Sequence, residues 1–342
     1  MPHLSAHPFA APKNLTFAVL RLLADGEFHS GELLAKQLGI SRASVNHALQ
    51  AVDRFGLTLH SIRGRGYRLA NPPHWLDAAE VAQHLGADAG RFHLQILDHA
   101  SSSNSLLLQQ ARQQALPSGS VLAAEWQSGG RGRLGRAWHA GLGNALTFSM
   151  LWRFPCGLAG LSGLSLATGV AVIRALHTLH IAGAQLKWPN DVVTDHGKLA
   201  GMLIEAQGDM LGPSAVVIGI GLNLRMPPAV AGRIDQPAAC LADLAGTLPN
   251  RNLLLAILLR ELGAVLSCFA VDGFAALRAE WESYHRQQGR PVCLTLPDGK
   301  NAHGIARGVT NDGALRLETT EGMQTFNSGE ISLRQETEHV AD

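Results

Sequence analysis

The sequence predicts an α+β protein of three domains: a winged helix-turn-helix, a central mixed α/β domain and a small β-barrel. Three observations predict this order. Residues 1–70 show three helical patterns and then a hairpin, residues 71–285 alternate apolar strands with helices, and residues 286–342 carry closely spaced turn signals. A chain of 342 residues is also longer than one hydrophobic core usually needs.

The amino-terminal helices are short and carry recognisable caps. Residues 15–23 have helical apolar periodicity, Ser30 and Ser41 precede the second and third helices as N-caps, and Gly39 supplies the turn between them. The apolar stripe expected for the second helix consists of Leu33, Leu34 and Leu38, and that of the third of Val45, Leu49 and Val52. Residues 57–62 and 67–69 then predict the two strands of a wing.

This first unit is predicted to bind DNA. Residues 1–70 carry eight Lys and Arg against four Asp and Glu, although the whole chain has a formal charge of only +1. The outward face of the third helix and the tip of the wing offer side chains that suit base edges and phosphates: Arg42, Ser44, Asn46, His47, Gln50, Arg63 and Arg65. The alternative is a winged helix kept only for folding or for contacts between subunits.

Bulk composition excludes several classes of protein. Charged residues make up 16% and apolar residues 46%, which is typical of a globular chain. The four cysteines are scattered without a CxxC pair, so neither a structural zinc site nor a disulfide framework is expected. The uncharged run 154–173 contains four glycines and a proline, which favours a buried helix over a membrane span, and no signal peptide pattern begins the chain. We therefore expect a cytoplasmic protein.

The most informative segment is rich in glycine and arginine: residues 129–136 read Gly-Gly-Arg-Gly-Arg-Leu-Gly-Arg. Glycines let the backbone approach a ligand closely, and arginines supply charged, forked donors for phosphate or carboxylate. Residues 130–135 match the GxGxxG pattern, but no Asp or Glu occurs between residues 126 and 190, so the acid that binds the ribose in a Rossmann site is missing. The alternative is a solvated basic loop, but such a loop would not explain why glycine and arginine alternate so regularly.

The acid-free stretch should place positive charge around an anionic ligand. Its cations are Arg131, Arg133, Arg136, Arg153, Arg174 and Lys187. A Walker A motif is absent, so phosphates would have to be held by these side chains and by a glycine loop of another kind.

Four further segments carry candidate site residues. Residues 187–191, Lys-Trp-Pro-Asn-Asp, follow an expected strand end, where ligands collect in α/β sheets. Lys198 can reach back toward them, although an exposed lysine at a hairpin turn is an equal alternative. Gly219 and Gly221 leave room for a flat ligand against the backbone, or mark a strand bend. Residues 101–104 form a hydroxyl-rich turn that contacts a ligand or only caps the next helix.

Together these segments resemble the biotin protein ligase family, in the bifunctional type that is fused to a biotin operon repressor. The resemblance rests on Ser102-Ser103-Asn104, Glu125-x-Gln127, Gly130-Arg131-Gly132-Arg133-x-Gly135-Arg136-x-Trp138, Lys187-Trp188-Pro189-Asn190-Asp191, Lys198-Leu199-Ala200-Gly201, Gly219-x-Gly221-x-Asn223 and Gly329-Glu330-Ile331-Ser332-Leu333-Arg334. It extends over nearly the whole chain, and it implies a class II synthetase-like catalytic domain and an SH3-like carboxyl-terminal domain.

The resemblance also implies roles for the matched residues. The biotin-binding set would be Ser102, Ser103, Asn104, Gln127, Gly130, Arg131, Arg133, Lys198, Gly219 and Gly221. The ATP- and AMP-binding set would be Arg131, Arg133, Arg136, Trp138 and Asn223. The catalytic residues would be Lys198, Arg133, Arg136 and Asp191, with Asp191 orienting Lys198 or a magnesium ion and with no fixed metal site. The chain departs from the family pattern at Ser103, Leu134 and His47, where relatives carry threonine, a basic residue and lysine.

The activity implied by the resemblance is biotin ligation. ATP and Mg²⁺ would convert biotin to biotinoyl-5'-AMP, and a lysine of the biotin carboxyl carrier protein of acetyl-CoA carboxylase would accept the biotin. An adenylate-bound homodimer would bind operator DNA and repress biotin synthesis genes. One alternative is a lipoate or octanoate ligase, which needs a long apolar channel that the polar Ser102, Ser103 and Gln127 argue against. Another is a non-catalytic biotin sensor, which would have no use for Arg133, Asp191 and Lys198.

Overall fold

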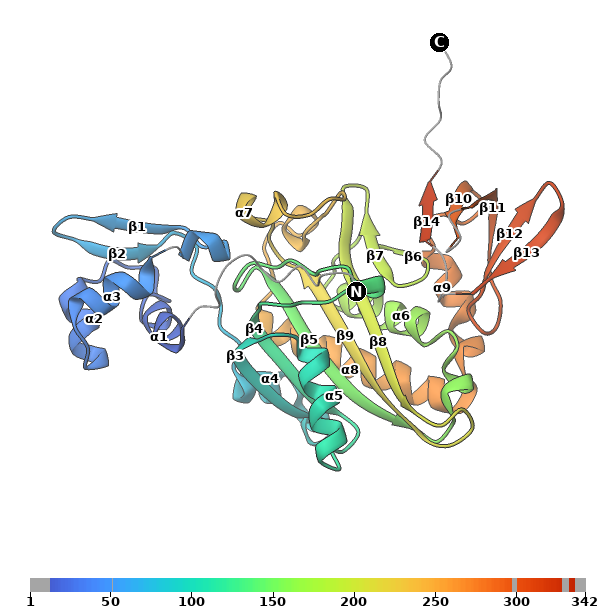
Figure 1. Ribbon diagram of the computed structural model, residues 1–342, viewed down its shortest axis with the longest axis horizontal. Helices are drawn as coiled ribbons and strands as arrows, with labels where there is room; N and C mark the ends of the chain where they lie inside the picture. Colours follow the sequence, from blue (N-terminus) through green and yellow to red (C-terminus); the bar gives the residue numbers. More distant parts are fainter. Residues whose placement is uncertain (1–12, 51, 297–299, 328–331, 336–342) are drawn as a thin grey trace, which may run out of the picture.

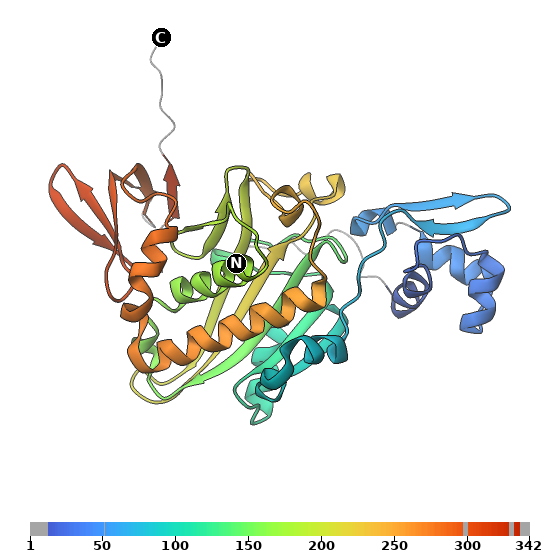
Figure 2. The same cartoon turned by 180° about the vertical axis from the view of Figure 1, so that it is seen from behind.

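The computed structural model describes residues 13–50, 52–296, 300–327 and 332–335, arranged as three parts along one axis. A small helical unit with a hairpin lies at one end, a large sheet with its helices in the middle, and a second, smaller sheet at the other end (Figure 1). The view from behind shows the long helices that cover the large sheet (Figure 2). The predicted fold class is confirmed.

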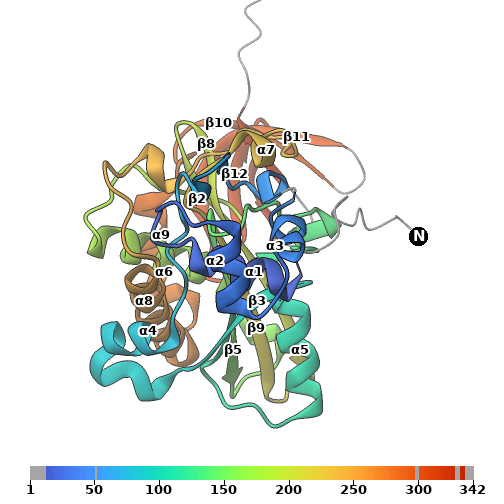
Figure 3. The same cartoon turned by 90° about the vertical axis from the view of Figure 1, so that its left-hand side faces the viewer.

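The amino-terminal unit is a winged helix-turn-helix, seen nearest the viewer in Figure 3. Its elements are α1 Asn14–Leu22, α2 Gly31–Leu38, α3 Arg42–Leu49, β1 Leu59–Ile62 and β2 Gly66–Leu69. The predicted caps are present, because Ser30 Oγ accepts from Leu33 N at 3.1 Å and Ser41 Oγ from Ser44 N at 3.0 Å. Gly39 ends α2 with a φ of 65°, which a side chain would disfavour.

The predicted apolar stripe of α2 was wrong at Leu33. That side chain is 44% exposed, whereas Leu34 is fully buried. The two neighbours are about 100° apart around the helix, so only one of them can face α1 and α3. The buried face of α2 is instead completed by Gly31 and Ala35.

The central domain is built on a seven-stranded mixed sheet with strand order β3-β4-β5-β9-β8-β7-β6. Among its described strands only β3 and β4 pair in parallel, and the other neighbours are antiparallel. The strands are β3 His93–Ala100, β4 Ser120–Gln127, β5 Ala145–Phe154, β6 Gln185–Lys187, β7 Asp191–Thr194, β8 Gly197–Gly208 and β9 Ser214–Asn223. The helices are α4 Ala78–Leu85, α5 Ser103–Gln113, α6 Leu164–Thr178, α7 Pro228–Ala231 and α8 Arg251–Asp272.

The two faces of this sheet have different coverings. One face packs against α4, α6 and α8 and holds the main core. On the other face, Leu107 of α5 packs against Leu151 of β5 and Val217 of β9. Successive strand residues point to opposite faces, so the odd-numbered residues of β5 and β9 near Thr147 and Gly219 face the same side as α5. A site formed there has a rigid sheet as its floor.

Two segments among the described residues are long and apolar enough to cross a membrane, namely 158–178 and α8. Most of each is buried within the protein, against the sheet and against one another. The uncharged run 154–173 is therefore a core helix with its leading loop, as the sequence predicted.

The carboxyl-terminal part is a five-stranded antiparallel sheet with strand order β13-β12-β11-β10-β14. Its strands are β10 Pro291–Thr295, β11 Asn301–Val309, β12 Leu315–Thr319, β13 Gly322–Phe326 and β14 Ser332–Gln335, and α9 Arg278–Tyr284 precedes them. The turn between β11 and β12 packs against the central domain, where Trp188 Nε1 donates to Gly313 O at 3.0 Å. Arg286 N donates to Leu186 O at 2.9 Å, so the carboxyl-terminal part is also hydrogen-bonded to β6.

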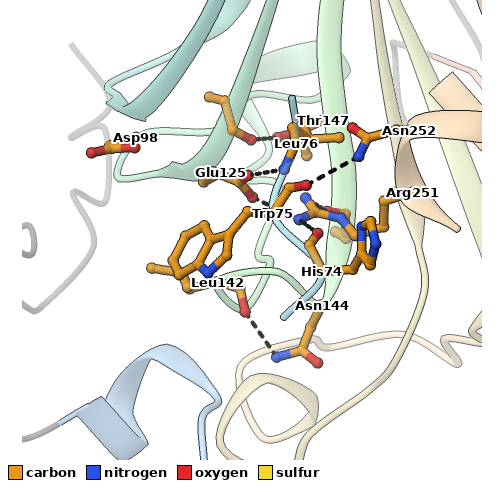
Figure 4. A network of polar contacts seen from close by, with 12 residues as sticks. His74, Trp75, Leu76, Asp98, Glu125, Leu142, Asn144, Thr147, Arg251 and Asn252 are labelled. Atoms are coloured by element: carbon orange, nitrogen blue, oxygen red, sulfur yellow. Dashed lines mark hydrogen bonds and ion pairs between the residues drawn. The ribbon is translucent and has the colours of Figure 1, made fainter. Parts of the chain in front are cut away.

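A buried ion pair holds the segment that joins the first unit to the central domain (Figure 4). Arg251 at the start of α8 bonds Glu125 of β4 at 2.7 Å, and the exposed fractions of the two side chains are 4% and 0%. Glu125 also accepts from Leu76 N at 2.6 Å, and Arg251 donates to His74 O at 2.8 Å. A charge pair with this many hydrogen bonds fixes the joining segment firmly against the sheet.

The amino-terminal unit also touches the central domain directly. Arg21 pairs with Asp98 at 2.6 Å, and the ring of Phe55 meets Trp126 edge-on at 5.2 Å between centroids. Leu142 N donates to Phe55 O at 2.8 Å. The contact therefore reaches the chain segment that follows the glycine-rich loop.

Candidate active site

A cavity of about 600 Å³ lies on the α5 face of the sheet, and most of the predicted site residues line it. These residues are Ser102, Ser103, Asn104, Gln127, Arg131, Arg133, Arg136, Trp138, Asp191, Lys198, Gly219 and Gly221. Segments more than a hundred residues apart in sequence therefore converge on one space. The volume suits a small molecule together with a nucleotide.

One end of the cavity, here called the cationic end, gathers the basic residues around the loop after β6. Lys198 Nζ lies 2.7 Å from Asp191 Oδ1, and Arg133 donates to Asn190 Oδ1 at 3.1 Å. Asn190 and Asp191 are adjacent, so one rigid turn positions both cations. The Lys198 side chain is only 20% exposed, which rules out the alternative of a solvated lysine at a hairpin turn.

Arg133 at the cationic end keeps its charge despite partial burial. Burial lowers the pKa of Arg133, the nearby Asp191 carboxylate opposes that shift, and Arg136 adds to it. A guanidinium starts from such a high pKa that it remains protonated at neutral pH. Two arginines and a lysine thus face the same space, which is the arrangement that phosphate groups require.

The other end, here called the polar end, is a compact set of hydroxyl and amide groups at the start of α5. Ser103 N donates to Gln127 Oε1 at 2.7 Å, which fixes the orientation of that amide. Ser149 Oγ lies 2.7 Å from Ser103 Oγ and 2.5 Å from Asn104 Oδ1. Ser102 caps α5 by accepting from Ser105 N at 3.4 Å. Ser102, Ser103, Asn104 and Gln127 are buried and line the cavity, so their remaining hydrogen-bonding capacity is available to whatever enters it.

The two glycines of β9 serve neighbouring side chains as well as the cavity. A Cβ atom on Gly219 would lie 2.2 Å from Asn104 Oδ1, and one on Gly221 would lie 2.5 Å from the Trp138 ring. Both glycines line the cavity, but in this structure their bare backbone makes room for Asn104 and Trp138. Trp138 also covers Lys198, whose Nζ is 5.9 Å from the ring centroid.

Two predicted residues lie behind the cavity wall. Asn223 is buried and donates to Lys198 O at 3.3 Å and to Ala239 O at 3.0 Å, so its amide holds two backbone segments together. Gly130 accepts from Trp138 N at 2.8 Å, and a Cβ on it would lie 2.6 Å from Trp138 O. Their contacts fit a supporting role better than a direct one.

The expectation that all six cations of the acid-free stretch surround the ligand was wrong for two of them. Arg174 of α6 pairs with Glu280 on the far face of the sheet. Arg153 lies at the distant end of β5 and donates to Leu116 O at 3.0 Å. Position along a strand or helix, which composition does not report, decides which charges reach the cavity.

The structure adds residues that the sequence did not single out. Ser149 is fully buried beneath the polar end, and Glu205 of β8 receives Arg131 at 2.6 Å. Asp235 and Gln236 line the cationic end from the loop after α7. Ser149 and Glu205 could have been found from the alternation of side chains along β5 and β8. The loop that carries Asp235 and Gln236 has no motif that would identify it. Residues 329–331 of the last motif lie outside the described residues.

Most of the predicted DNA-contact residues are exposed on the amino-terminal unit. Arg42, Asn46, His47 and Gln50 are exposed on and just after α3, and Arg63 and Arg65 are exposed at the wing tip. Ser44 is half-buried, and its backbone N–H is engaged by the Ser41 cap. Arg65 also stacks over Phe28, with 4.2 Å between its guanidinium carbon and the ring centroid, which holds the wing arginine in place.

Comparisons with protein families assign a description to each part. Residues 97–223 match the Biotin/lipoate A/B protein ligase family, residues 289–334 match the Biotin protein ligase C terminal domain, and residues 15–68 match an HTH domain. The first match contains the polar end, the glycine-rich loop, and Asp191 and Lys198 of the cationic end.

Similar proteins are known over most of the chain. The Bifunctional ligase/repressor BirA of Escherichia coli is 38% identical over 316 residues, which is 92% of this chain and 96% of that protein. The Biotin–[acetyl-CoA-carboxylase] ligase of Mycobacterium tuberculosis is 34% identical over 253 residues, or 73% of this chain and 92% of that protein. A solved structure of biotin protein ligase from Aquifex aeolicus in complex with biotin and ATP has a TM-score of 0.62 at 29% identity, and covers 71% of this chain and 99% of that one.

Proposed function

The chain belongs to the biotin protein ligase family, and on that premise we propose that it converts biotin and ATP to biotinoyl-5'-AMP and then biotinylates a carrier lysine. One observation carries the proposal. A single cavity has a compact polar end for a ring with hydrogen-bonding groups and a cationic end for a triphosphate. The acceptor is a lysine of the biotin carboxyl carrier protein of acetyl-CoA carboxylase, the enzyme named with the mycobacterial relative.

The first step is activation of a carboxylate. A carboxylate oxygen of biotin attacks the α-phosphorus of ATP, the bond from that phosphorus to the bridging oxygen breaks, and pyrophosphate leaves. Two anions must approach each other, so fixed cations are needed where negative charge accumulates. Lys198 and Arg133 supply them, and Arg136 lies beside them in the same wall. Because Asp191 and Asn190 hold the two cations in advance, little reorganisation is needed during the reaction.

The second step transfers the acyl group. The neutral amine of the carrier lysine attacks the carbonyl carbon of the mixed anhydride, and AMP leaves with the bond electrons. The glycine-rich loop between Gln127 and Trp138 lies along the cavity and would shield the anhydride from water until the carrier arrives.

Magnesium is best assigned to the ATP complex. Among residues 13–50, 52–296, 300–327 and 332–335 there is no group of three or more His, Cys, Asp or Glu side chains placed to hold a metal ion. Mg²⁺ commonly binds through one or two carboxylates plus substrate phosphates. Asp191 and Asp235 both line the cationic end, and they fit that mode.

A pyrophosphate assay separates this function from its rivals. With ATP and Mg²⁺ we expect pyrophosphate release on adding biotin, and release at least about a hundredfold slower with lipoate or octanoate, because an alkyl chain leaves the polar end without partners. Release with lipoate equal to that with biotin would favour a lipoate ligase. No release with any of the acids, despite biotin binding, would identify a sensor.

We also propose that the amino-terminal unit binds operator DNA, as an adenylate-bound homodimer that represses biotin synthesis genes. The supporting observation is the exposed surface of α3 and the wing described above, beside an HTH match and relatives described as ligase/repressors. Two helix-turn-helix units related by a two-fold axis would read half-sites about one helical turn, or a multiple of it, apart. The protein would work in the cytoplasm, where both the operator and the carrier protein are found.

Salt dependence tests the DNA contact. Arg63→Ala and Arg65→Ala should each weaken operator binding and reduce the slope of log K against log salt by roughly one. Lys300→Ala, just before β11 in the carboxyl-terminal part, is the control and should change neither. Operator binding that ignores salt, or that is identical with and without biotin and ATP, would contradict the assignment.

A further inference from the structure

The carboxylate of Glu205 joins two walls of the cavity. One of its oxygens accepts from Arg131 at 2.6 Å and from Asn104 Nδ2 at 3.0 Å. Arg131 belongs to the glycine-rich loop, whereas Asn104 belongs to the first turn of α5, and Glu205 itself stands on β8. One side chain of the rigid sheet therefore ties the loop to the polar end.

Beyond Gly129, whose N–H donates to Ser101 O at 2.7 Å, the glycine-rich loop is attached by charged side chains, through Arg131 to the sheet and through Arg133 to the turn at Asn190. Its backbone hydrogen bonds run mostly within the loop, from Gly132 N to Arg136 O and from Trp138 N to Gly130 O. Leu134 at its tip is 76% exposed and has a φ of 55°, so packing does not hold the tip. Backbone with this many glycines loses much conformational entropy when it is ordered. A charged anchor to the sheet offsets that loss.

Asn104 depends on the same carboxylate for its orientation. Its Nδ2 donates to Glu205 and to Leu203 O at 3.2 Å, which turns Oδ1 toward Ser149. Ser149 in turn contacts Ser103, whose N–H sets the Gln127 amide. A loss of the charge at Glu205 would therefore loosen the loop and the polar end together.

We propose that Glu205 is a positioning residue that latches the glycine-rich loop through Arg131 and orders the polar end through Asn104. This inference rests on the proposed ligase function. It assigns Glu205 to retention of the ring substrate and of the adenylate, and it leaves phosphate recognition to the cationic end. Arg131 then acts on the substrate while it is held in place by Glu205.

Glu205→Gln tests the latch, because glutamine keeps the size of the side chain and removes its charge. We expect the dissociation constant of biotin and the rate at which adenylate escapes to solution without carrier to rise by about tenfold each, with the KM for ATP within about twofold. The matched control is Glu318→Gln, which removes a carboxylate bonded to Arg307 at 2.7 Å far from the cavity and should change none of the three. The AMP released in a single turnover measures the escape of the adenylate.

A double variant separates a latch from a general loss of structure. If Arg131 works through Glu205, Arg131→Gln combined with Glu205→Gln should release adenylate no faster than the more severe of the two single variants. Fully additive effects, or a Glu205→Gln enzyme that binds biotin and retains adenylate like the wild type, would overturn the proposal. Wild-type enzyme that makes no adenylate would instead refute the ligase function.

Discussion

Lys198→Ala should slow biotin-dependent pyrophosphate release by about a hundred- to a thousandfold, the usual loss on removing one fixed group that stabilises transition-state charge. The Lys198 ammonium is already positioned, 2.7 Å from Asp191, in a partly enclosed site where water cannot replace it well. Its removal leaves two anions to react with one fewer cation between them. Single-turnover release of labelled pyrophosphate measures the effect.

The control for that variant is Lys36→Ala, which removes an exposed lysine from α2 and should leave the rate unchanged. Lys198→Ala should melt at a lower temperature than Lys36→Ala, because the pair is only about one-fifth exposed and the substitution leaves the Asp191 carboxylate without its partner. The rates are therefore compared at a temperature at which both proteins are folded. A Lys198→Ala enzyme that retained more than about a tenth of the wild-type rate would remove Lys198 from the catalytic set.

Arg251→Met should destabilise the central domain by about 3–5 kcal/mol. The substitution leaves the carboxylate of Glu125, at 0% side-chain exposure, without its partner, and His74 O and Ala145 O lose a donor as well. The midpoint and slope of the central domain's urea transition give the change in the free energy of unfolding.

The matched comparison is Arg307→Met, which breaks a pair of the same length whose side chains are 45% and 48% exposed. It should cost no more than about 1 kcal/mol, because water solvates the remaining charge. The double variant Glu125→Leu with Arg251→Met should recover part of the loss, since no buried charge remains, but Leu76 N still lacks its acceptor. If the two single variants lost the same free energy of unfolding, burial of the Arg251–Glu125 pair would not be the reason for its contribution.

Local rules predicted much of this fold correctly. The caps at Ser30 and Ser41 and the turn at Gly39 are set by hydrogen bonds within one or two turns of helix, so short sequence windows contain the necessary information. The glycine and arginine alternation and the loop at residues 187–191 are likewise local patterns, and both contribute residues that line the cavity.

Features that depend on long-range geometry could not be read in the same way. Nothing local shows that Arg174 of α6 pairs with Glu280, 106 residues later in the chain, and not with a ligand in the cavity. Leu33 was misplaced because an apolar residue on a helix flank satisfies a loose pattern without being buried. Glu205 escaped notice since its partners come from segments 74 and 101 residues earlier in the chain.

The hydrogen bond from Trp188 to Gly313 bears on whether the protein can be truncated before its carboxyl-terminal part. The indole is 1% exposed and directly precedes the turn that carries Asn190 and Asp191, yet its acceptor belongs to the carboxyl-terminal sheet. A fragment ending at residue 285 would strand a buried N–H donor beside that turn and would also lose the bond from Arg286 to Leu186. The carboxyl-terminal part should therefore stabilise the turn that carries two of the site residues. We expect an enzyme truncated to its catalytic domain to have reduced activity.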